Sequence, residues 1–365
     1  MSEQTIKDFR VRIDSLDDRV LELISERAFC AQEVARAKIA SVATGEVPIF
    51  YRPEREIQVL KRMIKRNKGP LSNEEIVWLF REIMSSCLAL EQPLKVAYLG
   101  SEGNFTQLAA MKYFGHAVIS KPIAAIDELF CDVVAGVVKF GVVPISNSTE
   151  ELVDHMLDSF FERNMVICGE VDLRIQHHLL VCGNTKTNRT TSVYSHTQSL
   201  VQCSKWLYAN YPNVERVTWS SDAEAAKLAQ SNEWNSASIT GDMVESPYRL
   251  TSMVEKIEDL QDNFTRFLII GSEEIPPTGD DKTSIIVSMS NRPEALYKLL
   301  VPFYEHRIDL TRIEVRLARS SKSTYMFFVD FIGHCRDSLV KDVLEQVSHE
   351  ALTFKILGSY PKAVL

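Results

Sequence analysis

The amino-acid sequence predicts a multidomain protein with an all-α N-terminal part, an α/β middle part and an α+β C-terminal part. Its 365 residues exceed what one hydrophobic core usually holds. Three observations support this division. No Gly or Pro occurs between Ile6 and Ile39, and strand patterns alternate with helix patterns after Pro93. A linker rich in Pro and Gly, residues 274–282, then precedes a βαββαβ order of predicted elements.

Composition narrows the class of function. The chain is 45% hydrophobic and 25% charged, as is typical of soluble globular proteins, and its formal net charge of -8 gives no reason to expect nucleic acid or an acidic membrane as partner. No apolar run reaches the ~20 residues that span a bilayer, and no signal peptide is evident. Seven scattered cysteines without a CxxC pair indicate reduced thiols, so we expect a cytoplasmic protein. His177 and His178 form the one histidine cluster, and we interpret them as strand packing and expect no metal.

The first predicted helix carries charges in its apolar seam. Apolar residues recur at alternating three- and four-residue spacing at Ile13, Leu16, Val20 and Leu23. Continuing this spacing places Arg27 in the seam and Lys38 beside its end. At ~100° per residue the two share one face. Cations on a core face need a buried anionic partner, which is either a ligand or the protein's own carboxylates.

Two shorter helices are predicted to follow. Pro53 suits the first turn of the second helix, and Gly69-Pro70 ends it. A capping-box pattern over residues 72–75 opens the third helix, on which Cys87 and Glu91 are four apart and adjacent. Three helices, one of them much longer than the others, do not form a complete hydrophobic core in a single chain, so we expect a dimer.

This N-terminal part, residues 1–93, resembles the all-helical chorismate mutase domain of the bifunctional chorismate mutase–prephenate dehydratases. The matching residues are Arg10, Arg27, Lys38, Arg55, Glu56, Cys87 and Glu91. The resemblance implies that Arg10 and Arg27 hold the carboxylates of chorismate, that Lys38 faces the ether oxygen, and that Arg55, Glu56 and Cys87 contact substrate. Arg10 and Lys38 lie 28 residues apart, or roughly 42 Å along a helix. One chain cannot bring both to a single ligand, so Arg10 would come from a second subunit.

Two positions of this N-terminal part depart from a common form of the family. Arg52 replaces an acidic residue, and Glu91 stands where Gln can face the ether oxygen. A carboxylate would repel the negative charge that grows on that oxygen, so Glu91 must be protonated to donate a hydrogen bond. We therefore predict that burial raises the pKa of Glu91 and that mutase activity falls towards high pH.

In the middle part, polar clusters follow the predicted strands. They occur at residues 100–106, 146–149 and 195–198, and in the stretch 263–267 (Asn-Phe-Thr-Arg-Phe), which leads into an apolar strand. Each cluster alone is more often a helix cap than a site. Open α/β sheets bind ligands at the carboxyl ends of their strands, so four such clusters together predict a binding site.

This part, residues 94–274, resembles the prephenate dehydratase domain, whose fold is two α/β lobes like those of periplasmic binding proteins. The chain would cross between lobes near residues 175 and 262.

The resemblance implies that Thr265 donates a hydrogen bond to the leaving hydroxyl of prephenate, without a cofactor. Residues implied in substrate binding are Asn147, Ser195, Gln202 and Arg266. Ser146 and Glu151 replace a usual Glu and a usual Gly, which leaves open a binding lobe without activity.

The C-terminal part, residues 282–365, has the ferredoxin-like order and resembles an ACT domain. The resemblance implies that phenylalanine binds there, near Ala295, Leu296, Glu314 and Arg316. Glu294 and Leu317 replace a usual Gly and a usual Pro. Because Glu294 adds bulk and negative charge beside the expected amino-acid carboxylate, we predict weakened feedback inhibition.

The whole pattern predicts a bifunctional enzyme of phenylalanine biosynthesis, which converts chorismate to prephenate and prephenate to phenylpyruvate under feedback by phenylalanine. It is expected to be a homodimer, with a tetramer as a further option. The alternative is an active mutase fused to degenerate dehydratase and ACT domains that serve only as binding modules. A periplasmic solute-binding protein shares the two-lobed pattern but carries a signal peptide.

Overall fold

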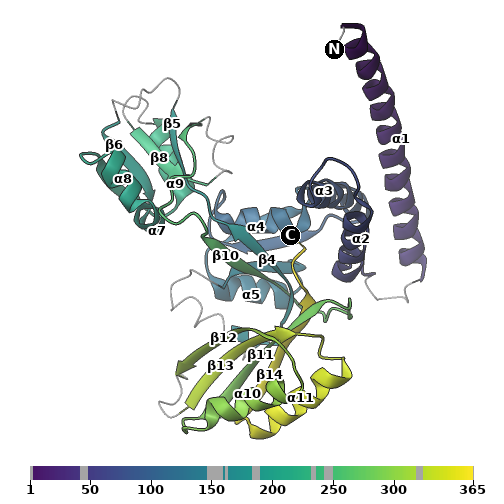
Figure 1. The fold of residues 1–365 in the computed structure, drawn as a ribbon, viewed down its shortest axis with the longest axis vertical. Coiled ribbons are helices and arrows are strands. Elements are labelled where there is room, and N and C mark those ends of the chain that lie inside the picture. Colours follow the sequence, from purple (N-terminus) through teal and green to yellow (C-terminus); the bar gives the residue numbers. More distant parts are fainter. Residues whose placement is uncertain are drawn as a thin grey trace. The chain divides into compact units, whose positions relative to one another are not determined.

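A computed structural model describes residues 3–41, 48–145, 159–160, 163–182, 190–231, 236–241, 250–317 and 324–364 (Figure 1). Contacts divide the chain into two compact units. The N-terminal unit is Met1–Leu94 with Phe114–Ile119 and Val364–Leu365, and the larger unit is Lys95–Tyr113 with Ser120–Ala363. Among the described helices, none is long and apolar enough to cross a membrane.

The described residues of the N-terminal unit form three helices: α1 (Glu3–Ser41), α2 (Pro53–Arg66) and α3 (Asn73–Glu91). Pro53 occupies the first turn of α2, where its missing N–H costs no hydrogen bond. The predicted capping box begins α3: Glu75 N–H donates to Ser72 Oγ at 3.1 Å, and Ser72 N–H donates to Glu75 Oε2 at 2.8 Å. Ile57, Leu60 and Val77 form the small core between α2 and α3.

Most of the apolar seam of α1 is open to solvent in the single chain. The predicted seam residues Ile13, Leu16, Val20 and Leu23 are between 46% and 61% exposed. Helix α1 contacts α3, and Ala35, near the C-terminal end of α1, is buried. A row of exposed large aliphatic side chains on one helix face is a feature of interaction surfaces.

The larger unit begins with a mixed five-stranded sheet in the order β2-β1-β3-β10-β4. Its strands are β1 (Lys95–Leu99), β2 (Ile119–Ile123), β3 (Phe140–Pro144), β4 (Val166–Arg174) and β10 (Phe264–Gly271), and its helices are α4 (Phe105–Phe114) and α5 (Ile126–Val134). Strands β1 and β3 are parallel, whereas β10 runs antiparallel to both of its neighbours, β3 and β4. Strand β10 therefore brings its N-terminal residues, including Thr265 and Arg266, next to the C-terminal ends of β3 and β4.

A second five-stranded sheet has the order β7-β6-β8-β5-β9. Its strands are β5 (His178–Cys182), β6 (Ser192–His196), β7 (Glu215–Trp219), β8 (Ser236–Thr240) and β9 (Leu250–Val254), and its helices are α7 (Thr197–Gln202), α8 (Ser204–Asn210) and α9 (Asp222–Ser231). The chain enters this sheet after β4 and returns to the first sheet before β10.

The last four strands form an antiparallel sheet in the order β12-β13-β11-β14. The elements are β11 (Asp281–Ser290), α10 (Ala295–Glu305), β12 (Leu310–Leu317), β13 (Thr324–Ile332), α11 (Ser338–Glu350) and β14 (Thr353–Pro361), which is the predicted βαββαβ order. Residues of α10 and α11, such as Leu299 and Val343, share a core with this sheet.

Other residues of this C-terminal sheet share a core with the first sheet. Ile286, Phe328 and Tyr360 cluster with Leu268 and Ile270 of β10. Gly358 of β14 has φ 156°, and a Cβ placed there would come within 2.2 Å of the Ile167 carbonyl oxygen on β4. Glycine therefore permits the close approach of β14 to β4.

Candidate active sites

The first candidate site lies between α1 and α3 in the N-terminal unit. Lys38, in the last turn of α1, places Nζ 4.0 Å from Oε2 of Glu91, which ends α3. The same ammonium donates to the Phe50 carbonyl oxygen at 3.0 Å. The structure thus brings together two of the predicted catalytic residues, which are 53 positions apart in sequence.

Glu91 has the electrostatic environment that the sequence predicted. Burial raises the pKa of Glu91, although Lys38 and Arg27 on α1 both act to lower it. Its Oε2 atom is buried and accepts no hydrogen bond from the described residues. Because burial outweighs the nearby cations, this carboxyl group can hold a proton and donate a hydrogen bond to a ligand oxygen.

Glu56, another predicted residue of this site, is paired with an arginine of the protein itself. Glu56 is largely buried and accepts a hydrogen bond from Arg81 Nε at 3.2 Å, which links α2 to α3. Burial raises the pKa of Glu56, although Arg81 and a hydrogen bond from Tyr51 act to lower it. Arg81 is only 7% exposed and was not singled out from sequence, because its partner lies 25 positions away. Its contact with Glu56 gives that carboxylate a structural partner.

Arg10, Arg55 and Cys87 complete the predicted set for the first site. Arg10 is exposed on α1, far along the helix from Lys38. Arg55 is exposed, and its Nη1 lies 3.4 Å from Gln58 Oε1 on the same helix. Cys87 is buried on α3, one turn before Glu91. Their roles towards a ligand stay predictions.

The second candidate site is a cavity of about 460 Å³ in the larger unit. It is lined from both five-stranded sheets and the segments that join them, and three of the four predicted polar clusters contribute to it. The lining residues are Gly100, Ser101, Asn104, Phe105, Thr106, Pro144, Ile175, His177, His196, Gln198, Ser199, Gln202, Ser220, Ser221, Asp222, Thr265 and Phe267. The fourth cluster, with Asn147, lies outside the described residues.

His177 is a lining residue that sequence analysis assigned to strand packing instead. Its Nε2 lies 2.8 Å from Gln202 Oε1, and its backbone N–H donates to Glu258 Oε2 at 3.0 Å. Its Nδ1 is buried and has no hydrogen-bond partner among the described residues. His177 directly precedes β5 and lies in the segment that joins the two sheets. This position between the sheets was the feature of the sequence that could have indicated a role in ligand binding.

Ser195 requires a correction. It is fully buried and is not among the residues that line the cavity, and its Oγ lies 2.9 Å from Asp222 Oδ1 and 2.8 Å from the Ile239 carbonyl oxygen. Asp222 also accepts from the Ser199 hydroxyl and the His196 backbone N–H. Ser195 therefore orients Asp222, and the cavity-facing groups are Asp222 and Ser199, which sequence analysis missed.

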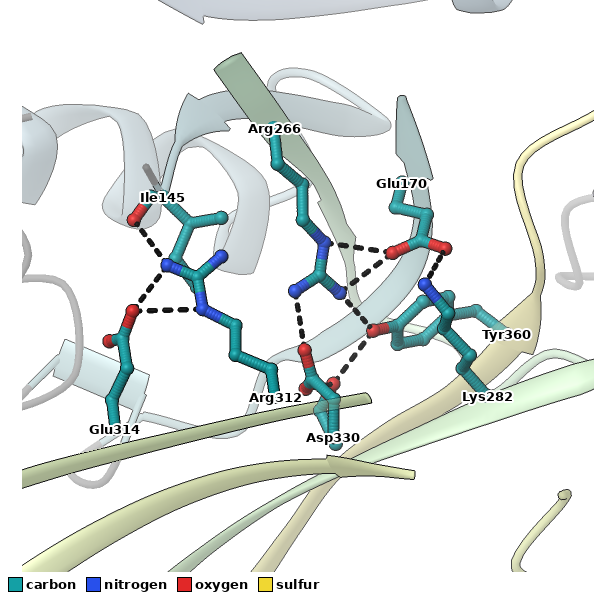
Figure 2. A network of polar contacts seen from close by, with 9 residues as sticks. Ile145, Glu170, Arg266, Lys282, Arg312, Glu314, Asp330 and Tyr360 are labelled. Atoms are coloured by element: carbon teal, nitrogen blue, oxygen red, sulfur yellow. Dashed lines mark hydrogen bonds and ion pairs between the residues drawn. The ribbon is translucent and has the colours of Figure 1, made fainter. Parts of the chain in front are cut away.

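Thr265 and Arg266 are neighbours on β10, and the side chains of successive strand residues point to opposite faces. Thr265 lines the cavity. Arg266 is 9% exposed and pairs with Glu170 of β4 and Asp330 of β13, and it donates to the Tyr360 hydroxyl at 2.8 Å (Figure 2). The prediction that Arg266 binds substrate is therefore wrong: the protein's own carboxylates satisfy its guanidinium.

The predicted effector residues lie on α10 and β12. Ala295 and Leu296 begin α10, with Ala295 buried and Leu296 exposed. Glu314 Oε1 accepts from Arg312 Nε at 2.8 Å, and Glu314 Oε2 lies 3.9 Å from Arg316 Nη2. That Oε2 atom is buried and accepts no hydrogen bond from the described residues.

Comparison with known proteins gives two family matches. Residues 96–275 match the model of prephenate dehydratase, and residues 9–92 match the model of chorismate mutase type II. A bifunctional chorismate mutase/prephenate dehydratase of Pseudomonas aeruginosa is 65% identical over 100% of this chain and 99% of its own length. One of Stutzerimonas stutzeri is 66% identical over 100% of both chains.

Among solved structures, a prephenate dehydratase from Arthrobacter aurescens, in complex with L-Phe, is similar. It is 28% identical, has a TM-score of 0.67, and the match covers 73% of this chain and 90% of that one. This match is longer than the segment, residues 96–275, that matches the dehydratase family model.

Proposed function

Because the chain belongs to the family of bifunctional chorismate mutase/prephenate dehydratases, we propose that its two units carry out the two reactions in turn. The N-terminal unit rearranges chorismate to prephenate, and the larger unit converts prephenate to phenylpyruvate, CO2 and water. The observation that carries this proposal is the cavity beside Thr265, into which three predicted polar clusters converge.

The mutase reaction is unimolecular, so the protein needs to hold one conformer and stabilise the charge that develops. As the ether C–O bond breaks, negative charge grows on its oxygen. Lys38 supplies a cation there, and protonated Glu91 supplies a hydrogen-bond donor. Arg27, whose charge acts on Glu91, would hold a carboxylate of chorismate.

A second copy of the chain would complete this site. Arg10 and Lys38 lie on one continuous helix, so Arg10 cannot reach a ligand held by Lys38 of its own chain. The exposed apolar seam of α1 supports a homodimer in which two such helices pack together. Arg10 of the partner would then meet the second carboxylate of chorismate.

The dehydratase reaction removes two groups from one ring. The bond from the ring to a carboxylate breaks, CO2 leaves, and the electron pair of that bond enters the ring, which becomes aromatic. The ring hydroxyl departs as hydroxide and takes up a proton from solvent to become water. Thr265 donates a hydrogen bond to the departing hydroxyl, and because its side chain is buried this bond is stronger than in water. Because Gln202 Oε1 accepts from His177, its NH2 group is left as the donor for a substrate carboxylate.

The alternative of a dehydratase domain that only binds ligands is disfavoured. The cavity is present with Thr265 on its wall. A relative 65% identical over the whole chain carries the name of both activities. The direct test supplies purified protein with prephenate and measures phenylpyruvate in alkali, then repeats the assay from chorismate. Phenylpyruvate from both substrates supports the proposal, and loss of chorismate without phenylpyruvate would restrict it to the mutase.

The pH dependence of the mutase tests the role of Glu91. The raised pKa favours the protonated form, which donates to the ether oxygen, so activity is highest at low pH and falls as pH rises through that pKa. Glu91→Gln keeps the donor without a titrating proton, so its profile should be flat over the same range. A wild-type rate that does not change between acid and alkaline pH would contradict this role.

The C-terminal domain is proposed to be an ACT domain that binds phenylalanine, which its βαββαβ order supports. Glu294 directly precedes α10, where an amino-acid carboxylate would lie, and like charges there weaken binding. Glu294→Gly is expected to lower the phenylalanine concentration for half-inhibition of the dehydratase by roughly tenfold, for ~1.4 kcal/mol of lost repulsion. Titration of both proteins with phenylalanine checks this; equal curves would mean that Glu294 does not face the effector.

A further inference from the structure

The guanidinium of Arg266, on β10, lies at the centre of a buried polar network with residues of β4, β11, β13 and β14 (Figure 2). Its Nε and Nη2 atoms lie 2.8 and 2.7 Å from Glu170 Oε2 on β4, and its Nη1 pairs with Asp330 on β13. Nη2 also donates to the Tyr360 hydroxyl on β14. The partners of this side chain thus lie on β4, β13 and β14, and the last two strands belong to the C-terminal sheet.

The partners of Arg266 are themselves held in place. Lys282 Nζ pairs with Glu170 Oε1 at 2.7 Å, and Ser284 bonds both Asp330 Oδ1 and the Tyr360 hydroxyl. Two cations therefore face two carboxylates. Burial alone would lower the pKa of Arg266, but Tyr360, Asp330 and Glu170 raise it well above its ordinary value, so the guanidinium stays charged. A charge-balanced network with so many hydrogen bonds fixes the geometry of every member.

The backbone of Arg266 connects this network to a second wall of the cavity. Ile145 N–H donates to the Arg266 carbonyl oxygen at 2.9 Å, and Ile145 follows Pro144, which lines the cavity. The Ile145 carbonyl oxygen in turn accepts from Arg312 Nη2 of β12 at 3.3 Å (Figure 2). The C-terminal sheet thus contacts the ends of both β10 and β3 where they meet the cavity.

We propose that Arg266 is a positioning residue of the dehydratase site, through which the C-terminal sheet sets the place of the Thr265 hydroxyl in the cavity. The two residues are joined by one peptide bond and face opposite sides of β10, so a shift of the Arg266 side chain moves Thr265. The proposal rests on the proposed function only in that Thr265 acts on prephenate. It explains why a charged residue occupies a strand that is otherwise apolar from Phe267 onwards.

The test uses variants in the C-terminal sheet, because these residues do not line the cavity. Asp330→Asn removes the negative charge that faces Arg266, and Tyr360→Phe removes the hydroxyl that accepts from it; both keep the shape of the side chain. Both are expected to lower kcat for prephenate by about ten- to a hundredfold, the cost of a misplaced catalytic group, with KM within about twofold of wild type.

Thr283→Val is the matched control. Thr283 is buried on β11 between Lys282 and Ser284, but its hydroxyl bonds Gly333 and Ser359 and not the Arg266 network. It should lose thermal stability and keep its kcat.

Chorismate mutase activity of the same samples measures the amount of enzyme, and thermal unfolding of each variant shows whether the larger unit is folded. A higher KM with an unchanged kcat in Asp330→Asn or Tyr360→Phe would overturn the proposal, and so would unchanged constants in both variants. If Asp330→Asn does not fold, Tyr360→Phe decides alone, since it removes a hydroxyl without leaving a charge unpaired. A different result would show that the proposed function itself is wrong. In that case Thr265→Ala would convert prephenate as fast as wild type.

Discussion

Replacing Thr265 with alanine is expected to lower kcat for prephenate by about 10²–10³-fold, the usual loss when one preorganised donor is removed from a developing negative charge. Thr265 lines the cavity and is 7% exposed, so little water could replace its hydroxyl. KM should change far less, because the hydrogen bond strengthens mainly as the ring hydroxyl departs. Steady-state rates of phenylpyruvate formation measure both constants.

Two further substitutions at this position separate chemistry from packing. Thr265→Val keeps the shape of the side chain and removes the hydroxyl, so it should be as slow as the alanine variant. Thr265→Ser keeps the hydroxyl and should retain most of the rate. The mutase activity of all three should equal that of wild type, since Thr265 belongs to the other unit. A valine variant with wild-type dehydratase activity would remove Thr265 from the mechanism.

Replacing Lys38 with methionine is expected to lower the mutase kcat by a similar factor, about 10²–10³-fold. Methionine keeps much of the length and apolar stem of lysine but loses the cation 4.0 Å from Glu91. The negative charge that grows on the ether oxygen would then lack its counter-charge. Loss of chorismate absorbance measures the rate, and dehydratase activity from added prephenate should be unchanged.

Arg36→Gln is the matched control for Lys38. Arg36 lies two residues earlier on α1, is exposed, and pairs with Glu33 on the same helix. Removing this cation tests whether general positive charge on α1 attracts the dianionic substrate. It should leave kcat unchanged. If Arg36→Gln and Lys38→Met reduced the rate equally, Lys38 would act through the overall field of the helix and not at the ether oxygen.

Local patterns allowed much of the fold to be predicted. The run without Gly or Pro predicted α1 as one helix, and the capping box predicted the start of α3. Both signals depend on residues close together in sequence and not on remote partners. The βαββαβ order of the C-terminal part also followed from periodicity. The segment with Asn147 lies outside the described residues, so its assignment stays a prediction.

The candidate sites were harder to predict where partners are remote in sequence. A buried Arg in the stretch 263–267 correctly indicated a buried anion, but not which one, because Glu170 and Asp330 lie 96 and 64 positions away. Strand alternation alone would have placed Thr265 and Arg266 on opposite faces. Asp222 was missed for the same reason: its contact with Ser195 spans 27 positions.

A crystal structure of Thr265→Val with prephenate would show the substrate in place, because this variant should hold prephenate without converting it. We expect prephenate in the cavity of the larger unit, with its ring hydroxyl against position 265, a carboxylate near the Gln202 amide, and Arg266 still paired with Glu170 and Asp330. Prephenate bound to the Arg266 guanidinium, or an empty cavity at saturating prephenate, would contradict this prediction.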